Sequence, residues 1–217
     1  REKLKSWVEE GGVLFLGPMS GYRTEYWTAF TDHAMGDLES WMDIEVLSRI
    51  PIDPYNQDYD TEPEVILDNS LGMSPSKAGL WSEALRTAKG RILAEYRSGM
   101  HDGLPAIVAN HVGKGEVVVF GTDPGADVMK KLVLKYTGEI GIEPLAKGDK
   151  GVLLVPRSGV DDDFLMVINL ENQERTIELN EPEWHNMMNN TDYESATLVL
   201  NPYEVLICRP STAQSRN

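Results

Sequence analysis

Apolar and polar positions follow two different patterns along the chain, and the first pattern extends to about residue 148. Residues 1–10 carry apolar side chains at helical spacing, and residues 13–17 follow as a continuous apolar run. A strand without polar positions is typical of one buried on both faces, as in the centre of a parallel sheet. Such a strand needs neighbours on both sides, yet the helical pattern already includes Arg1. We therefore expect the chain to be a piece of a larger protein, cut within an α/β domain.

The same alternation of helix and strand patterns continues through the first 148 residues. Helical spacing predicts helices at 37–43, 80–88 and 126–137, with Gly138 placed to end the last of them. Apolar runs predict strands at 44–50, 65–67 and 92–96, and a hairpin formed by 106–112 and 116–121. The acidic, proline-containing stretch between them, 51–64, is predicted to be a loop. These elements indicate an open parallel sheet of the amidotransferase or flavodoxin type over residues 1–148, incomplete at its N-terminus.

A second pattern begins at residue 149, where helical spacing disappears and turn residues recur every 10 to 12 positions. Strands are predicted at 152–156, 164–169, 176–179, 184–188, 196–200 and 205–209. This spacing favours a small antiparallel β-sandwich over residues 149–210, followed by a tail at 211–217. The charge changes at the same place, because residues 151–217 carry 11 acids and 4 bases, whereas residues 1–150 carry 24 and 16.

Composition excludes several classes of function. The formal net charge is −15 and no basic patch stands out, so neither nucleic acid nor an anionic membrane surface is an expected partner. No apolar run approaches the roughly 20 residues of a membrane-spanning helix. We favour a cytoplasmic location, although the sequence leaves the compartment open. The single cysteine, Cys208, excludes an internal disulfide and is predicted to be an inert core residue.

Candidate catalytic and metal-binding motifs are few. The chain has no Gly-x-Ser-x-Gly or Gly-x-Cys-x-Gly elbow, which argues against a nucleophilic hydrolase. Asp32, His33 and Asp37 resemble part of a metal site, but no second histidine is spaced to complete it. Neither a metal nor a cofactor is therefore expected, and the residues around His33 are predicted to form a polar loop.

The best candidate for function is an aromatic segment that follows the apolar run at 13–17. Ligands of open α/β sheets gather at the carboxyl ends of strands, and aromatic residues with arginine are enriched at protein interfaces. An interface, local packing and contact with a sugar all remain open for this segment. Its interface or substrate-cleft candidates are Tyr22, Arg23, Tyr26, Trp27 and Phe30.

Several segments carry a resemblance to a known family, the family 42 β-galactosidases. The stretch at 4–21, LKSWVEEGGVLFLGPMSG, resembles the region that follows the catalytic barrel in that family. Residues 80–122 are similar to the later part of the same domain, through Trp-x-Glu-x-Leu, Gly-x-Pro-Ala and Asn-x-x-Gly-Lys-Gly. Residues 165–179 and 200–208 are similar to its small C-terminal β-domain. The order and spacing of these segments cover most of the chain.

The resemblance implies a function for the parent enzyme and a different one for this chain. The parent would hydrolyse terminal β-galactosides with retention, using two glutamates of a barrel that would precede Arg1. This chain would be the non-catalytic trimerisation and C-terminal region, with other copies of itself as partners and no catalytic residue of its own. Two alternatives stay open, a carbohydrate-binding module and an independent amidotransferase-like enzyme. The first is disfavoured because Trp184 is the only tryptophan of the sandwich, and the second because the nucleophile elbow is missing.

Overall fold

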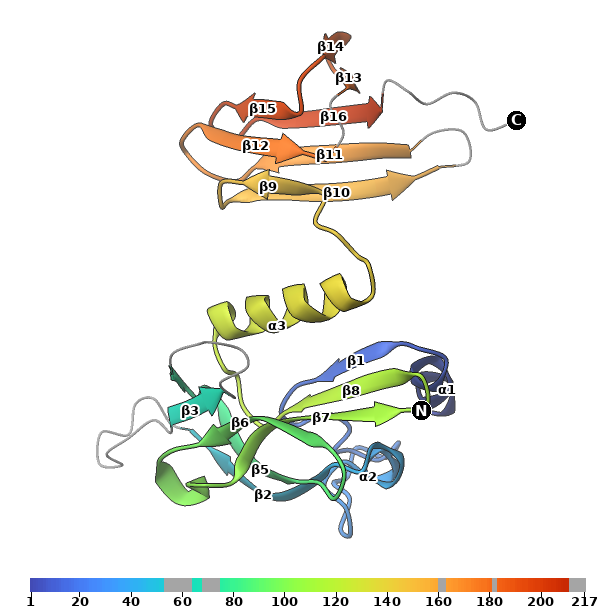
Figure 1. The fold of residues 1–217 in the computed structure, drawn as a ribbon, viewed down its shortest axis with the longest axis vertical. Coiled ribbons are helices and arrows are strands. Elements are labelled where there is room, and N and C mark those ends of the chain that lie inside the picture. The colour runs from blue at the N-terminus through green and yellow to red at the C-terminus, as the bar shows by residue number, and fades with distance from the viewer. Residues whose placement is uncertain (53–63, 68–74, 160–162, 181–182, 211–217) are drawn as a thin grey trace. The chain divides into compact units, whose positions relative to one another are not determined.

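The computed structural model describes residues 1–52, 64–67, 75–159, 163–180 and 183–210. It divides the chain into two compact units, residues 1–140 and residues 141–217. Figure 1 shows both units. The predicted tail at 211–217 and most of the predicted loop at 51–64 lie outside the described residues.

Within its described residues, the first unit mixes three α-helices with a larger number of strands. Its elements are α1 (Glu2–Glu9), β1 (Val13–Leu16), α2 (Asp37–Met42), β2 (Glu45–Pro51), β3 (Glu64–Leu67), β4 (Ser76–Lys77), β5 (Trp81–Arg86), β6 (Arg91–Tyr96), the 3-10 helix Gly99–His101, β7 (Pro105–Val112), β8 (Gly115–Phe120) and α3 (Ala126–Glu139). Helices α1, α2 and α3, the strands at β1, β2, β3 and β6, and the β7–β8 hairpin confirm the corresponding predictions.

In the part of this unit that the structure describes, the main sheet has six strands in the order β1-β8-β7-β6-β3-β4, and β2 pairs separately with β5. Only β1 and β8 run parallel among the described pairs, so the expected open parallel sheet is not confirmed. The reason lies in the connections. Parallel neighbours need a long crossover, whereas β7 and β8 are joined by the tight turn at Gly113-Lys114 and must run antiparallel.

Strand β1 lies at the end of this strand order and not at its centre. Its apolar character has another cause, because both faces of the strand are covered. On one face of the sheet, the ring of Phe15 packs against those of Phe120 and of Tyr136 on α3, with 5.3 Å between ring centres in each pair. Leu14 and Leu16 pack on the other face, against the core that includes α2. A continuous apolar run therefore indicates that both faces of the strand are covered. It does not indicate whether the strand has neighbours on both edges.

The helix predicted at 80–88 is wrong, because this segment forms strand β5. It pairs with β2 from Trp81 opposite Pro51 to Arg86 opposite Glu45. Four successive residues of β5, 82 to 85, are buried, so both faces of the strand are covered. Apolar residues can then occupy either face, and their helical spacing in this segment is a coincidence. Pairing with a distant strand outweighed the local pattern.

Helix α3 ends one residue after the predicted Gly138. Gly138 is still helical, and Ile140 is the C-terminal cap. The glycine that leaves the helix is Gly141, whose φ of 74° lies in the left-handed region that favours glycine.

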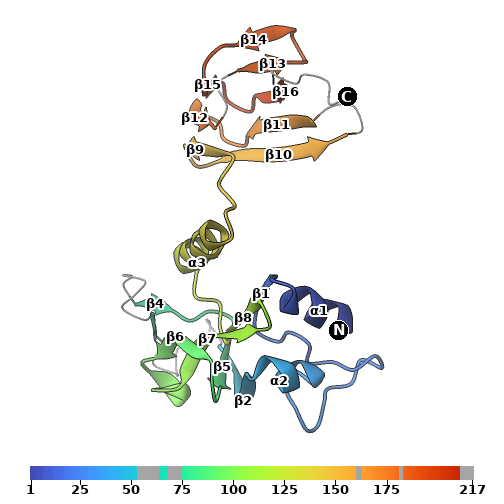
Figure 2. The same ribbon diagram turned by 45° about the vertical axis from the view of Figure 1, so that its right-hand side comes forward.

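The sheet of the first unit separates two apolar cores. Val128, Leu132 and Tyr136 of α3 pack on one face, against Ile107 and Phe120 of the sheet. Residues of α2, β2 and β5 pack on the opposite face. Figures 1 and 2 both show α3 on one side of β7 and β8, with α2, β2 and β5 on the other. Strand β1 and helix α2 both pack in this layered arrangement, so the two ends of the aromatic segment between them are held in place.

The second unit is built from strands alone within its described residues. They are β9 (Ala146–Gly148), β10 (Val152–Ser158), β11 (Asp163–Asn169), β12 (Arg175–Leu179), β13 (Trp184–Asn186), β14 (Thr191–Tyr193), β15 (Thr197–Leu200) and β16 (Val205–Pro210). They form a sheet in the order β10-β11-β16-β13-β14 and a smaller sheet in the order β15-β12-β9. All described pairs are antiparallel, and one core joins residues from both sheets.

The predicted strands of the sandwich are confirmed, but β9 and β14 were not predicted from the sequence. Strand β9 is only three residues long, and its pairing with β12 places residues 146–148 in the second unit. The structural division accordingly falls after Ile140. A strand of this length carries too few residues to show alternation, so only pairing reveals it.

Candidate functional site

The aromatic segment between β1 and α2 forms a short hairpin-like loop. Arg23 and Ala29 form an antiparallel bridge, and the Thr24 N–H donates to the Thr28 carbonyl at 2.8 Å. The Trp27 N–H donates to the Thr24 carbonyl at 3.0 Å, which closes the turn. Trp27 has a φ of 64°, an uncommon conformation for a bulky residue. The backbone of the loop is therefore held in one shape by its own hydrogen bonds.

Arg23 joins the two aromatic halves of this loop. Its Nε donates to the Tyr22 hydroxyl at 2.6 Å, and its Nη1 donates to the Trp27 carbonyl at 3.2 Å. The guanidinium also lies 5.0 Å from the Tyr22 ring centre and 5.9 Å from that of Trp27. These distances are within reach of a cation–π interaction. The arginine thus limits the freedom of the Trp27 side chain without covering it.

The five residues predicted from the sequence have two roles in the structure. Tyr26 and Trp27 form the exposed tip of the loop, with 79% and 78% of their surface accessible. Tyr22 and Phe30 are half-buried at its base, where the Phe30 N–H faces the Tyr22 carbonyl at 3.4 Å. Both base rings are covered by arginines of other elements, Tyr22 by Arg49 at 5.7 Å and Phe30 by Arg1 at 5.0 Å.

A buried ion pair, which the sequence does not reveal, supports the start of this loop. Glu83 on β5 is 1% exposed and pairs with the guanidinium of Arg49 on β2. The Met19 N–H donates to the same carboxylate at 3.1 Å, three residues before the aromatic segment begins at Tyr22. Glu83 and Arg49 are 34 positions apart, and they meet because β2 pairs with β5. No local spacing could have indicated this pair.

His101 lies in a second buried polar cluster, next to the ion pair. Its Nδ1 is 2.6 Å from the Ser82 hydroxyl, and its Nε2 is 2.7 Å from the Ser48 hydroxyl. Burial lowers the pKa of His101, so the ring is neutral at pH 7. Each of the two serine hydroxyls can then form a hydrogen bond with one ring nitrogen. Burial also raises the pKa of Tyr96 to about 12, and its ring contacts that of His101. Residues 102–103 form a turn, and His101 before it is part of the core.

The residues that resembled a metal site do not come together. The Asp32 carboxylate accepts the N–H of His33, whereas Asp37 pairs with Arg1 at 3.4 Å. His33 instead faces Glu39, with 3.4 Å between Nδ1 and Oε2. Within the described residues, no group of three histidine, cysteine or acidic side chains could hold a metal ion.

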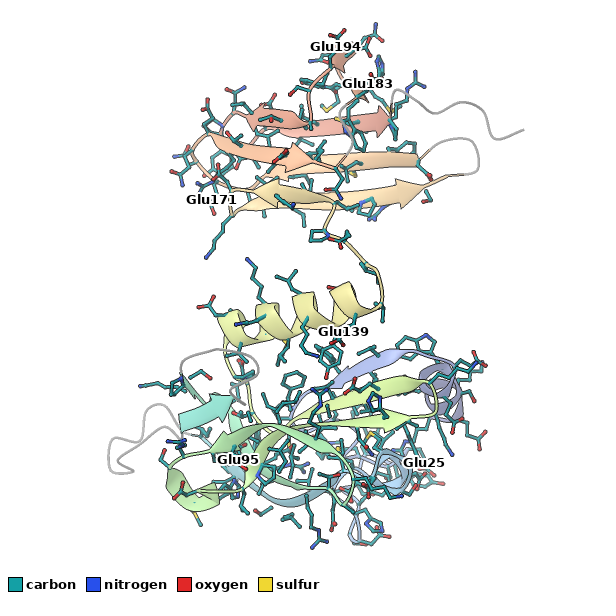
Figure 3. The ribbon with its side chains drawn as sticks, in the orientation of Figure 1. Glu25, Glu95, Glu139, Glu171, Glu183 and Glu194 are labelled. Carbon is teal, nitrogen blue, oxygen red and sulfur yellow. The ribbon has the colours of Figure 1, made fainter. Side chains whose placement is uncertain are left out.

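Each buried carboxylate of the described first unit already has partners in the chain. Besides Glu83, Glu39 accepts the Met35 N–H at 3.0 Å. Glu116 accepts a bond from Arg91 at 3.1 Å and one from Tyr136 at 3.2 Å. The glutamates labelled in Figure 3 also stand on separate elements and loops. The bonds of these carboxylates hold strands and helices of the first unit together.

Comparison with known proteins identifies the first unit. Residues 1–143 match the family model of the β-galactosidase trimerisation domain. The chain belongs to this family. It is 28% identical over 174 residues to the β-galactosidase YesZ of Bacillus licheniformis, covering 78% of this chain and 25% of that protein. It is 27% identical over 209 residues to the β-galactosidase BgaA of a Planococcus species, covering 94% of this chain and 30% of that protein.

Solved structures show the same fold. The β-galactosidase of Bacillus circulans sp. alkalophilus matches with a TM-score of 0.86 at 20% identity, over 97% of this chain and 30% of that one. The enzyme of the haloarchaeon Halorubrum lacusprofundi matches with a TM-score of 0.74 at 22% identity, over 96% and 29%. The chain therefore spans between a quarter and a third of the length of these β-galactosidases.

The trimerisation-domain chain has no helix, among the residues described, that is both long and apolar enough to cross a membrane.

Its single thiol is expected to resist labelling. Cys208 on β16 is fully buried, and burial raises the pKa of the thiol to about 11. Because a thiol group must ionise to react, native protein at pH 8 should react with a disulfide reagent only as fast as the second unit opens. Denatured protein should react at once, and release of one thiol equivalent from native protein within seconds would contradict the assignment.

Proposed function

We propose that this chain is the non-catalytic self-association and C-terminal region of a retaining β-galactosidase. The match of residues 1–143 to the trimerisation-domain family carries this proposal. The relatives are named as β-galactosidases and are three to four times as long as the region matched, which leaves them ample length for a separate catalytic part. Galactosides would then be bound and cleaved in that part of the enzyme.

The chemistry of the described residues supports a non-catalytic role. A retaining glycosidase needs two carboxylates about 5 Å apart, one as nucleophile and one as acid and base. Glu39, Glu83 and Glu116 are the buried acids of the described chain, and they lie on α2, β5 and β8. Each is engaged by backbone N–H groups or by an arginine of its own unit.

We further propose that the first unit assembles as a homotrimer and that the tip of the aromatic loop lies in the contact between copies. Tyr26 and Trp27 present two large rings on a backbone that is already ordered, so little conformational entropy is lost when they are covered. Among the described residues, β1 is an edge strand that pairs in parallel with β8. This supports an amidotransferase-like origin for the unit, in which a further strand would pair with β1. The net charge of −15 supports a protein partner over nucleic acid or an anionic membrane, and we favour a cytoplasmic location.

Sedimentation and activity measurements on the purified chain test the proposal together. Wild-type chain should form trimers, and Trp27→Ala should weaken the association by roughly thirtyfold, the effect of losing a central aromatic contact. Met100→Ala is the matched control, because Met100 is 82% exposed in the same unit but lies outside the loop. None of the three proteins should release nitrophenol from a nitrophenyl galactoside.

Two results would count against the proposal. Turnover by a preparation free of host galactosidase would place catalytic residues within the chain. Equal association of the Trp27→Ala variant and wild type would remove the aromatic loop from the contact.

A further inference from the structure

The outer face of the larger sheet in the second unit is apolar. Residues of β11 and β16 alternate between buried positions, which form the core, and less buried positions on the opposite face. The pairing of β10, β11 and β16 arranges the outward positions in rows that cross the three strands. The first row is Leu153, Ile168 and Val205, and the second is Val155, Met166 and Ile207.

This arrangement departs from the ordinary pattern of a solvated sheet. An antiparallel sheet with one face in water usually alternates apolar inward and polar outward positions. Here both rows consist of apolar side chains, and Leu153 and Val205 expose 45% and 38% of their surface. Met187, next to Ile207, is 48% exposed. Contiguous exposed apolar patches are typical of surfaces that interact with another protein, a membrane or a ligand.

Charges at the two ends of this face have opposite sign. Beyond the apolar rows, Arg157 of β10 lies opposite Phe164 of β11, and β16 continues past Cys208, which lies opposite Leu165, to Arg209. Arg157 and Arg209 are two of the four basic residues in 151–217. The opposite end carries Glu171. Its Oε1 lies 2.8 Å from the position that a Cβ would take at Gly151. Figure 3 labels Glu171 at the end of the sandwich away from the tip of the β10 arrow. The face therefore runs from basic to apolar to acidic.

We propose that this face binds the same face of a second copy about a two-fold axis. A half-turn about an axis through the apolar rows places the Arg157 end of one copy over the Glu171 end of the other. The same operation stacks apolar rows on apolar rows, as a self-complementary two-fold interface requires. The two exposed aliphatic rows supply the buried area, and the opposed charges set the register.

This surface belongs to the second unit, whereas the proposed trimer contact at Tyr26 and Trp27 belongs to the first. The net charge of −15 repels copies from one another at low ionic strength. Salt screens that repulsion over about 8 Å at physiological ionic strength, whereas contacts within a dry apolar patch are little affected. Association through this face should therefore strengthen as salt is raised from low to physiological concentration.

A matched pair of valine substitutions tests the surface by analytical ultracentrifugation of the full chain. Val205→Lys places a charge in the apolar rows, and its association constant for the two-fold contact should fall at least about tenfold. Val199→Lys makes the same change at a position that is 57% exposed on β15 of the other sheet, and it should associate like wild type. Far-ultraviolet circular dichroism checks that both variants stay folded.

Charge reversal tests the register. Arg157→Glu and Glu171→Arg should each weaken self-association, because each homodimer then holds two like-charged contacts. An equimolar mixture of the two variants should recover it, because both contacts in the mixed dimer join opposite charges. The double variant, which carries both reversals, should also recover it.

The outcomes separate this inference from the proposed function. Six-copy assemblies support both contacts, and dimers that persist with Trp27→Ala support this one alone. Trimers or monomers that Val205→Lys leaves unchanged would overturn the two-fold contact, and would leave the face to a different partner. Loss of association in both valine variants, or no recovery in the mixture, would also overturn it.

Discussion

Replacing Glu83 by alanine should destabilise the first unit by about 3–5 kcal/mol, the usual cost of breaking a buried ion pair from one side. Glu83 is 1% exposed, and Arg49 is left without its carboxylate in a site where one of its nitrogens, Nη2, already lacks a partner. The Met19 N–H loses its acceptor as well. Urea denaturation followed by circular dichroism measures the change.

The matched control for Glu83 is Glu45, which pairs with Arg86 across the same two strands. Its side chain and that of its partner are 41% and 62% exposed, so Glu45→Ala should cost less than about 1 kcal/mol. Similar losses in the two variants would show that burial does not set the strength of these pairs.

The Glu83 variant should also change the fluorescence of Trp27, because Met19 precedes the aromatic loop.

Gly115→Ala should destabilise the first unit by about 3 kcal/mol or more, at the upper end of the cost of overpacking. A Cβ at this position would overlap the backbone carbonyl oxygens of Val8 and Gly12, which cannot rotate away as a side chain could. These carbonyls belong to the end of α1 and the turn after it. The backbone of the β7–β8 hairpin lies directly against them, where the Lys114 N–H donates to the Glu9 carbonyl at 2.9 Å.

Gly17→Ala is the control, because a Cβ there would meet nothing within 4 Å. It should leave the stability unchanged or raise it by about 0.4–1 kcal/mol, since alanine restricts the unfolded chain more than glycine does. Thermal unfolding of both variants provides the comparison. A small effect of Gly115→Ala would mean that α1 can move away from the hairpin at little cost.

Much of the candidate site could be predicted from the sequence because its residues are neighbours in the chain. Tyr22, Arg23, Tyr26, Trp27 and Phe30 lie within nine positions, so any short loop brings them together. Their division into an exposed tip and a half-buried base could not be predicted. It depends on Arg49 and Arg1, which reach the loop from other elements.

The sequence by itself determined the elements whose pattern is long and local. The stripe of α3, the tight β7–β8 hairpin and the regular strands of the second unit all repeat over enough residues to show their period. It also determined that no nucleophile elbow is present and that the only thiol is a core residue, because both follow from residue identity and immediate neighbours.

The tertiary structure alone decided what depends on distant pairing. It made β5 a strand where local spacing indicated a helix, and it placed β1 at the end of the strand order. It also joined Glu83 to Arg49 and set His101 between Ser48 and Ser82. The physical reason is the same in each case. A local pattern reports which faces of a segment are covered, whereas the partner that covers them is chosen by the free energy of the whole packed core.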